Sequence, residues 1–464
     1  MSTVHILTLL GAAPASAPAA VPGWQTAIFA AILVITLGLL AAERIQKTVL
    51  VLLSAGLCLV LADAWGYFPP ESGHGLPVYI RMIEWEVIGI VIGATVFIEI
   101  AARSGIFTWI SVRVLKISRG DPFRLLILFS ILTAVFSAFL DNITAMIIIG
   151  SLTIVSCRKL ELDPKPFLIT EGIMTNVGGL LTLISSIPNI IIGKTAGISY
   201  LTFLIVSVPY TALAIGASLL VARWTFGSAV RPLRDPAARK RNHELVLAFD
   251  EWETVGDRRF FYTSSIAVVA VILLFALHGQ IPILRDFGIE IVALGAAVIM
   301  MLLHAKDVEH DLSNVEWSLV FFFVGLFTII GVMEKAGVLL HIGHMLDGLT
   351  ARAGSVGLMW LTALFSSVTA NIPLAAMLAK TFGPTPAAVA AVPPDQWWAV
   401  VFGTNLGGNF TPIGSASTVV AVTIMKKNGM AVSFVEFVKV GMAFAVTQLA
   451  LASGYLLILR VIMT

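Results

Sequence analysis

The sequence predicts an all-α polytopic membrane protein built from two inverted halves, each with a re-entrant hairpin and a helix broken inside the membrane. Three observations predict it: the composition, a series of long apolar stretches, and a repeat at a nearly constant offset. The 464 residues are 58% hydrophobic and 12% charged, whereas soluble domains are about 25% charged. This composition excludes a disordered chain, a coiled coil and a nucleic-acid-binding surface, so we take lipid as the solvent.

Two smaller features constrain the chain further. Cys58 and Cys157 lie in apolar stretches, where cysteine behaves as a small buried hydrophobic residue. Neither the cysteines nor the eight histidines have the spacing of a disulfide framework or a metal site. Residues 1–24 are rich in Ala and Pro and lack Lys and Arg, which predicts a short N-terminal tail and not a secretory signal.

The apolar stretches predict the membrane crossings, because a helix needs about 20 mostly apolar residues to span the hydrocarbon core. Continuous crossings are predicted near 25–42, 47–63, 86–102, 200–223, 261–278, 289–303, 316–333 and 433–459. Two further stretches, 166–196 and 396–425, are too long and contain Gly, Pro and Asn, so we expect broken helices there. The stretches 122–157 and 355–380 have polar centres and predict re-entrant hairpins, which a membrane tolerates only where protein or water surrounds the tip.

The positive charges predict the orientation. The segments on one side of this topology hold 21 of the 29 Lys and Arg residues, and the opposite loops hold six. By the positive-inside rule the richer side is cytoplasmic, which places the N-terminus outside. The hydrophilic segment 224–260 then becomes a cytoplasmic linker between a first transmembrane half, 25–223, and a second one, 261–464.

The two halves repeat each other. Glu84-Trp85 and Glu316-Trp317 open spans 232 positions apart, so the repeats begin near 84 and 316. Further along the offset settles at 229, and a cluster of identities falls on it: Asn142 on Asn371, Asn176 on Asn405, Gly178 on Gly407, Gly179 on Gly408 and Thr182 on Thr411. An odd number of crossings separates the two copies, which inverts the second. Inverted repeats with paired broken helices are typical of secondary transporters with a site near the midplane.

The broken helices are the predicted ion- or substrate-binding elements. Gly permits unwound backbone and Pro ends a helix, so free amides and carbonyls become available to anions and cations. The candidates in the first break are Asn176, Gly178, Gly179, Thr182, Ser185, Ser186 and Asn189. The candidates in the second are Asn405, Gly407, Gly408, Thr411, Gly414, Ser415 and Ser417. The alternative for either copy is a Gly/Ser seam that only packs helices.

The hairpin tips and one glutamate complete the predicted site. Asp141, with Asn142 and Thr144, lies at the first tip, and an ionisable group at that depth is a functional candidate by default. It can carry a proton, attract Na⁺, or only cap a helix. The second tip has Asn371, but the position equivalent to Asp141 is Ala370. A single acidic residue is therefore expected at the two tips. Glu171 is predicted either as a proton relay or as a partner of a lysine such as Lys194.

These motifs resemble those of a known group of permeases. Ser137 to Thr144, with its Leu-Asp-Asn-Ile centre, resembles the first hairpin of the ArsB, NhaD and melanosomal P-protein permeases of the ion transporter superfamily. The segments Phe167–Ile190 and Asn405–Ser415 look like the two broken helices of that group. The sequence departs from the P-protein pattern at Ser185-Ser186, where Asp-Pro is usual, and at Ala370, where many members have Asp.

The resemblance implies a multi-pass permease of the inner (plasma) membrane, a homodimer, and a hairpin-bearing domain that moves as an elevator against a scaffold. It leaves three substrates open: arsenite or antimonite, Na⁺(Li⁺) exchanged for H⁺, and di- or tricarboxylates carried with Na⁺. The charge of Asp141 would repel a dianion, since two unit charges of the same sign at 4 Å and an effective dielectric of 20 repel each other by about 4 kcal/mol, whereas arsenous acid is neutral. We therefore expect a proton-coupled arsenite or antimonite efflux permease, with Na⁺(Li⁺)/H⁺ antiport as the first alternative.

Catalysis is not expected, because the sequence has no nucleophile–base pair or Gly-rich phosphate loop outside the apolar stretches. The expected partners are a small inorganic solute or ion and the bilayer. No cofactor is expected besides H⁺ or Na⁺ as the coupling ion, and use of ATP would require a separate ATPase subunit.

Overall fold

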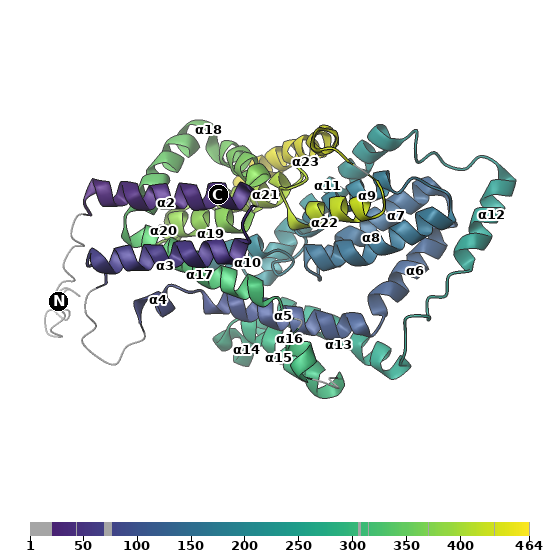
Figure 1. Cartoon of the computed structure of the whole chain (residues 1–464), viewed down its shortest axis with the longest axis horizontal. Coiled ribbons are helices and arrows are strands. Elements are labelled where there is room, and N and C mark those ends of the chain that lie inside the picture. Colours follow the sequence, from purple (N-terminus) through teal and green to yellow (C-terminus); the bar gives the residue numbers. More distant parts are fainter. Residues whose placement is uncertain are drawn as a thin grey trace.

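A computed structural model describes residues 21–42, 44–68, 77–304, 308–313, 315–369, 371–430 and 432–463, and all regular structure in these ranges is helical (Figure 1). The first half contains α2 (Gly23–Ala42), α3 (Lys47–Ala64), α4 (Val78–Arg81), α5 (Trp85–Arg103), α6 (Ile106–Ser118), α7 (Pro122–Ser137), α8 (Asn142–Lys159), α9 (Lys165–Gly178), α10 (Ile187–Thr195) and α11 (Tyr200–Phe226). The connecting segment forms α12 (Pro236–Leu247).

The second half repeats this order with small additions. It contains α13 (Arg258–Leu277), the 3₁₀ turn η1 (His278–Gln280), α14 (Pro282–Phe287), α15 (Glu290–His304), α16 (Val308–Ser313), α17 (Trp317–Lys335), α18 (Val338–Val368), α19 (Asn371–Phe382), α20 (Pro386–Ala391), α21 (Pro394–Gly407), α22 (Ala416–Lys427) and α23 (Phe434–Met463). Gly354, at φ 64° and ψ −168°, divides α18 into two helices. The polytopic all-α fold with inverted repeats is therefore confirmed.

The two predicted hairpins are present. The antiparallel helices α7 and α8 meet at a tip around Asp141, and the second part of α18 meets α19 just before Asn371. In Figure 1 the hairpin of α7 and α8 lies to the right of the centre and the hairpin of α18 and α19 to the left. The two hairpins thus approach the middle of the molecule from opposite ends, as an inverted repeat requires.

The long stretches are broken where the sequence predicts. The helix α9 ends at Gly178 and α10 begins at Ile187, with Pro188 in its first turn. The helix α21 ends at Gly407 and α22 begins at Ala416. Between the paired halves lie eight residues outside the helices, most of them buried in protein. Non-helical backbone is tolerated at membrane depth under this condition.

Seven helices in the described part of the chain are long and apolar enough to cross a membrane: α2, α3, α5, α11, α13 (with η1), α17 and α23. The predicted crossing at 289–303 forms α15, which has only 15 residues. At 1.5 Å per residue it is about 22 Å long, shorter than the hydrocarbon core of about 30 Å. The helix has the predicted length of 15 residues and begins one residue later than predicted.

Two helices outside the recognised repeats pack across the halves. The helix α3 lies against α17 of the second repeat, and α15 lies against α5 of the first. Gly93 and Gly325, which are 232 positions apart, occupy the close approaches, because a Cβ on them would lie 2.5 Å from Ala293 and 2.9 Å from Val51. These four helices form a cross-braced group that we call the scaffold, defined by α3, α5, α15 and α17.

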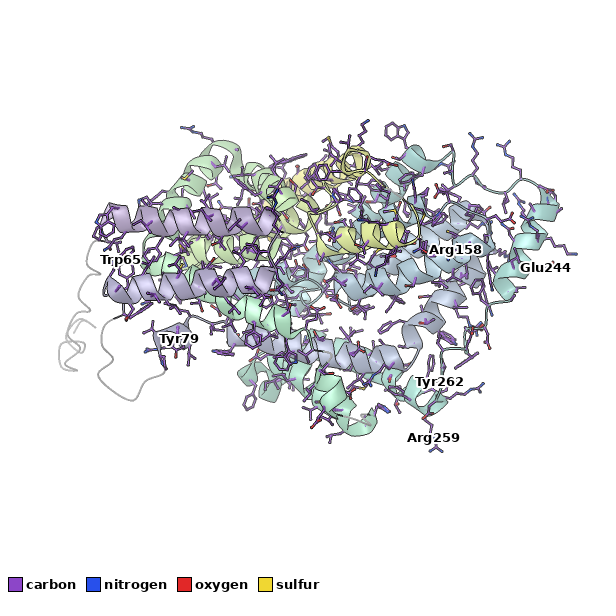
Figure 2. The ribbon with its side chains drawn as sticks, in the orientation of Figure 1. Trp65, Tyr79, Arg158, Glu244, Arg259 and Tyr262 are labelled. Atoms are coloured by element: carbon purple, nitrogen blue, oxygen red, sulfur yellow. The ribbon has the colours of Figure 1, made fainter. Side chains whose placement is uncertain are left out.

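The labelled residues of the predicted outer loop and of the predicted cytoplasmic segments lie at different ends of the molecule. Figure 2 shows Trp65 and Tyr79 at one end and Arg158, Glu244 and Arg259 toward the other. The first two belong to a predicted outer loop and the last three to predicted cytoplasmic segments. Most of the predicted N-terminal tail (1–20) and the tip residue Ala370 lie outside the described residues.

Candidate functional site

The two broken helices are locked together by their asparagines. Asn176 Nδ2 donates to Asn409 Oδ1 and to Ser415 Oγ, at 2.8 Å each. In the opposite direction, Asn405 Nδ2 donates to Asn189 Oδ1 at 2.8 Å. All of these side chains are buried. Because buried polar groups are costly when unpaired, this cross-pairing fixes the two breaks against each other in one register.

Matched hydrogen bonds join each break to its own hairpin. Ser137 Oγ donates to the carbonyl of Thr175 and Ser366 Oγ to that of Thr404, at 2.7 Å each. Thr182 Oγ1 and Thr411 Oγ1 likewise donate to the carbonyls of Ala138 and Ser367, at 2.7 and 2.6 Å. Every donor and acceptor pair repeats at the offset of 229, so the repeat extends to individual hydrogen bonds.

Gly178 and Gly407 are packing positions. A Cβ on Gly178 would lie 2.2 Å from the carbonyl oxygen of Ala134, and one on Gly407 would lie 2.3 Å from that of Ala363. Each glycine thus lets a broken helix touch its hairpin. Gly179, Gly408 and Gly414 line the turns of the breaks, where Gly408 and Gly414 contact each other closely.

A cavity of about 320 Å³ lies where the breaks and tips meet the scaffold. The hairpin tips contribute Asp141, Asn142 and Asn371, and the breaks contribute Ser185, Ser186, Gly414 and Ser415. The scaffold contributes Lys47 and Thr48 from the start of α3 and Glu316 and Ser318 from the start of α17. The predicted candidates from both repeats therefore surround one space, together with scaffold residues that the sequence did not single out.

Asp141 both caps a helix and faces this cavity. One oxygen, Oδ1, accepts the backbone amides of Ile143 and Thr144, at 2.9 Å each, which is typical N-cap geometry. The residue is nevertheless solvent-accessible and lines the cavity. The cap and a role in the site therefore coexist, because the cap uses only one of the two carboxylate oxygens.

Glu316 was missed by the sequence reasoning. It was recognised only as the start of a repeat, but its side chain is exposed and lines the cavity with Asp141. A signal was available, since a glutamate that opens a span in an apolar chain is unusual. What the sequence did not contain was that the start of α17 borders the same cavity as the tip of the first hairpin.

Several of the predicted candidates hold the tips and breaks together by hydrogen bonds, and two of them, Asn142 and Ser185, also line the cavity. Asn142 Oδ1 accepts from Ser137 Oγ at 2.5 Å, and Ser417 Oγ lies 3.4 Å from Asn176 Oδ1. Ser185 Oγ donates to the carbonyls of Gly179 and Thr182, which closes the first break. These hydrogen bonds hold the unwound backbone in place, so the same side chains support the site.

Glu171 lies away from the cavity. It is fully buried, and its Oε1 accepts a hydrogen bond of 2.6 Å from Thr153 Oγ1 on α8. Its second oxygen has no hydrogen-bond partner among the described residues. The predicted pairing with Lys194 is absent, because Lys194 binds Glu84 and Glu86 instead. A buried carboxyl with one unpaired oxygen is chemically suited to hold a proton.

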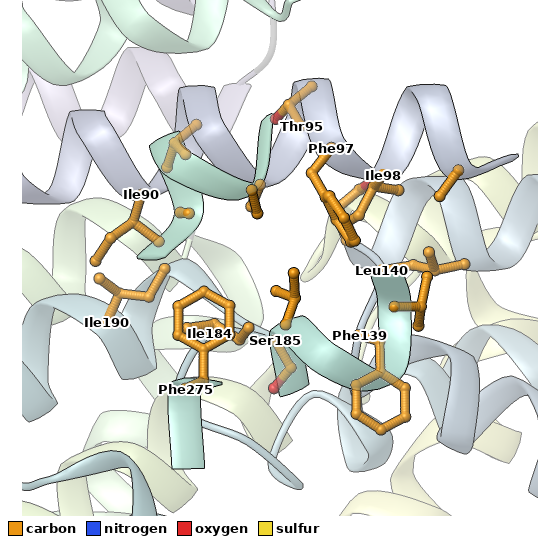
Figure 3. Close-up of a pocket in the computed structure, with 18 of the residues that line it drawn as sticks. Ile90, Thr95, Phe97, Ile98, Phe139, Leu140, Ile184, Ser185, Ile190 and Phe275 are labelled. Atoms are coloured by element: carbon orange, nitrogen blue, oxygen red, sulfur yellow. The ribbon is translucent and has the colours of Figure 1, made fainter. Parts of the chain in front are cut away.

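A second, apolar cavity of about 110 Å³ borders the first hairpin on the side of α5 (Figure 3). Ile90, Phe97 and Phe139 line it, with Phe275 from α13. Asp141, Ser185 and Glu316 are shared with the larger cavity. A small and mostly apolar cavity thus lies between the first hairpin tip and α5. Among the described residues no cluster of His, Cys, Asp and Glu is suited to a metal ion.

Solved structures share this architecture. The YdaH transporter of Alcanivorax borkumensis superposes with a TM-score of 0.58 at 13% identity, covering 89% of this chain and 98% of that one. MtrF of Neisseria gonorrhoeae, described as one of a class of antimetabolite efflux pumps, superposes with a TM-score of 0.58 at 11% identity, covering 93% and 97%. At this identity the likeness concerns the fold alone. The fold is thus one that multi-pass membrane transporters share.

Sequence relatives narrow this class. The CitMHS family, described as citrate transporters, matches residues 32–403, and the chain belongs to this family. A 46 kDa membrane protein of Mycobacterium leprae is 30% identical over 447 residues, covering 93% of this chain and 98% of that protein. An uncharacterized transporter of Mycobacterium tuberculosis is 30% identical over 424 residues, covering 90% and 95%. The human P protein is 27% identical over 515 residues and covers 94% of this chain, which spans 60% of the P protein.

Proposed function

We propose that the chain is a proton-coupled secondary transporter that exports arsenite or antimonite as the neutral acid. The observation that carries this proposal is the pair of carboxylates, Asp141 and Glu316, which face one cavity from opposite halves of the chain. Hydroxyl groups of Thr48, Ser186 and Ser415 line the same space. A neutral solute with several hydroxyl groups can donate to the carboxylates and accept from these hydroxyls.

The helix ends support a solute that both donates and accepts. The first turns of α8, α10, α19 and α22 all border the cavity, and helix N-termini present unpaired amides that favour acceptors. Asp141 satisfies two amides of α8, whereas no side chain caps α10. Pro188 has no amide hydrogen and the amide of Asn189 donates to the carbonyl of Ser186 at 3.0 Å, so the amide of Ile187 is the donor that the start of α10 offers to an oxygen of the solute.

Movement of the hairpins as an elevator supports this transport reaction. The hairpins and breaks are joined by the matched bonds described above, whereas apolar space separates the first hairpin from α5. A group that is tightly bonded within itself and loosely packed against its surroundings moves as a rigid body. We place proton coupling at Asp141 and Glu171, because both are carboxyls within this group.

The family description favours a second substrate class, a citrate-like carboxylate. Two acidic side chains would repel such an anion, so we expect it to enter only with a cation that the carboxylates bind. Lys47 also lines the cavity and adds positive charge. If the carboxylates bind a cation but no anion enters with it, the cation alone is carried, and the reaction is Na⁺(Li⁺)/H⁺ antiport.

Purified protein in liposomes tests these alternatives. We expect a pH gradient to drive accumulation of arsenite or antimonite, and Asp141→Asn to abolish it while preserving the helix cap, because Asn is an equally good N-cap. Glu244→Gln in the exposed part of α12 is the control and should transport normally.

Other outcomes decide against arsenite. Accumulation of citrate only in the presence of Mg²⁺ or Na⁺ would favour the carboxylate. Release of protons on addition of Na⁺, with no arsenite flux, would favour antiport. Unchanged arsenite flux in Asp141→Asn would remove Asp141 from the mechanism.

A further inference from the structure

The inverted repeat allows the two halves to be compared position by position. Glu84 and Glu316 are equivalent residues at the start of the scaffold helices α5 and α17. The hairpins and breaks correspond at the offset of 229, so α19 is equivalent to α8 and α10 to α22. In a perfectly symmetric molecule Glu84 and Glu316 would therefore have equivalent neighbours.

Their neighbours are different. Glu84 binds Lys380 at 2.6 Å and Lys194 at 2.7 Å, near the ends of α19 and α10 that lie away from the cavity. Glu316 instead lies beside Asp141, at the beginning of α8. One glutamate thus lies near the base of a hairpin and its equivalent lies at the tip of the other hairpin.

The difference between the two glutamates can be expressed as a distance along a hairpin helix. The equivalent of Lys380 is Ser151, which lies ten residues after Asp141 on α8. Ten residues of α-helix correspond to about 15 Å. The group of hairpins and breaks is therefore displaced along the scaffold by about half that length from the symmetric position.

We propose that Glu84, Lys194 and Lys380 form an ion-pair latch that holds the transporter at one end of a stroke of about 15 Å. At the other end Glu84 lies beside the second tip, near Asn371, and Glu316 lies beside Ser151. This inference rests on the elevator movement of the proposed function.

The ion-pair latch can form at only one end of the proposed stroke. The equivalents of Lys380 and Lys194 are Ser151 and Thr423, which carry no charge to bind Glu316. Glu86 also binds Lys194, at 2.9 Å, and all three latch side chains are partly buried. Burial opposes ionisation of Glu84, but the hydrogen bonds from Lys194 and Lys380 outweigh it and hold the pKa of this carboxyl below its usual value. The latch is therefore charged at neutral pH and favours the observed state.

Cysteine cross-linking of the full chain in liposomes tests both the stroke of about 15 Å and the ion-pair latch. Cys58 and Cys157 are first replaced, and Ser318→Cys is paired with Ser151→Cys to report the second state. Both serines are exposed. We expect the cross-link in the otherwise unaltered protein, and a rate about threefold to tenfold higher in Lys194→Gln/Lys380→Gln, since partly exposed ion pairs stabilise only modestly. A second pair, Ser318→Cys with Ile143→Cys, reports the observed state, because both positions line the cavity. Its cross-linking should be slower in Lys194→Gln/Lys380→Gln by a similar factor.

The controls separate this inference from the choice of substrate. Lys427→Gln, an exposed lysine at the end of α22, should leave both rates unchanged. Failure of Ser151 and Ser318 to cross-link in every variant, while Ile143 and Ser318 do, would overturn the stroke. Equal rates with and without the two lysines would overturn the latch. Neither readout needs arsenite, so a failed substrate assignment leaves both results interpretable.

Discussion

Asp141 illustrates how one side chain can satisfy a structural need and remain available for binding. Its Oδ1 atom accepts two amides of α8, and the side chain lines the cavity opposite Glu316. Glu171 is the opposite case: it is fully buried, and one oxygen is bound to Thr153 while the other has no partner in the described part of the chain. Two acids of the first repeat thus differ in access, because Asp141 is open to the cavity and Glu171 is sealed from it.

The role of Glu171 can be tested with a substitution that prevents ionisation and keeps the shape of the side chain. Glu171→Gln keeps an oxygen that accepts from Thr153 and cannot ionise. If Glu171 carries the coupled proton, flux driven by a pH gradient should fall by about 100-fold, the lower range for loss of a proton-transfer group. Substrate exchange at equal pH should persist.

Flux into liposomes with and without the gradient measures this difference. Thr153→Val is the control, because it removes the hydrogen bond and keeps the carboxyl, so coupling should remain. Gradient-driven flux at the original level in Glu171→Gln would leave Glu171 with a structural role only.

At the scale of elements, the broken helices are positioned by close backbone contact with the hairpins. Gly178 and Gly407 leave no room for a Cβ against Ala134 and Ala363. The matched bonds from Thr182 and Thr411 lie next to these contacts. Each break is thereby fastened to its own hairpin, and the asparagine cross-pairs then fasten one break to the other.

Substitution of these glycines should destabilise the protein. Gly178→Ala and Gly407→Ala each place a methyl group within 2.3 Å of a carbonyl oxygen, and overpacking of this kind costs about 1–3 kcal/mol. We expect a lower midpoint of thermal unfolding in detergent for both variants.

Gly216→Ala is the matched control, because Gly216 lies in α11 and no described atom lies within 4 Å of the place that its new methyl group would take. It should be neutral or slightly stabilising, since Ala favours helix over Gly by about 1 kcal/mol. Equal midpoints for all three variants would show that the contacts relax without cost.

At the scale of the whole molecule, the halves exchange scaffold helices. Because α3 braces α17 and α15 braces α5, neither repeat has a complete scaffold by itself. The connecting segment also contacts the base of the first hairpin, where Asn242 Nδ2 donates to the carbonyl of Gly120 at 3.1 Å. This segment is therefore fastened to the first half of the chain.

The orientation predicted from charge is open to direct measurement. Ala390→Cys lies in a predicted outer loop and Ser228→Cys in the predicted cytoplasmic linker, and both positions are exposed. In a background without Cys58 and Cys157, a membrane-impermeant maleimide should label Ala390→Cys in intact cells and Ser228→Cys only after permeabilisation. The reverse pattern would invert the topology and place the N-terminus inside.

The sequence by itself determined the hairpins, the two breaks and their repetition. These features depend on local properties: the length of an apolar stretch, a polar residue at its centre, and Gly and Pro where a helix must open. Pro188 with Asn176, and the same pattern around Asn405, were sufficient to place both breaks. Such signals act on the backbone without any contribution from distant residues, so sequence reasoning could follow them.

Only the tertiary structure decided which side chains meet. Asn176 pairs with Asn409, 233 positions away, Glu316 joins Asp141 in the cavity, and Glu171 turns to Thr153 instead of to the site. The structure also made Gly178 a packing contact and Glu84 the partner of two lysines. The physical reason is that these contacts depend on how the two halves dock against each other, and no local pattern of residues encodes that docking.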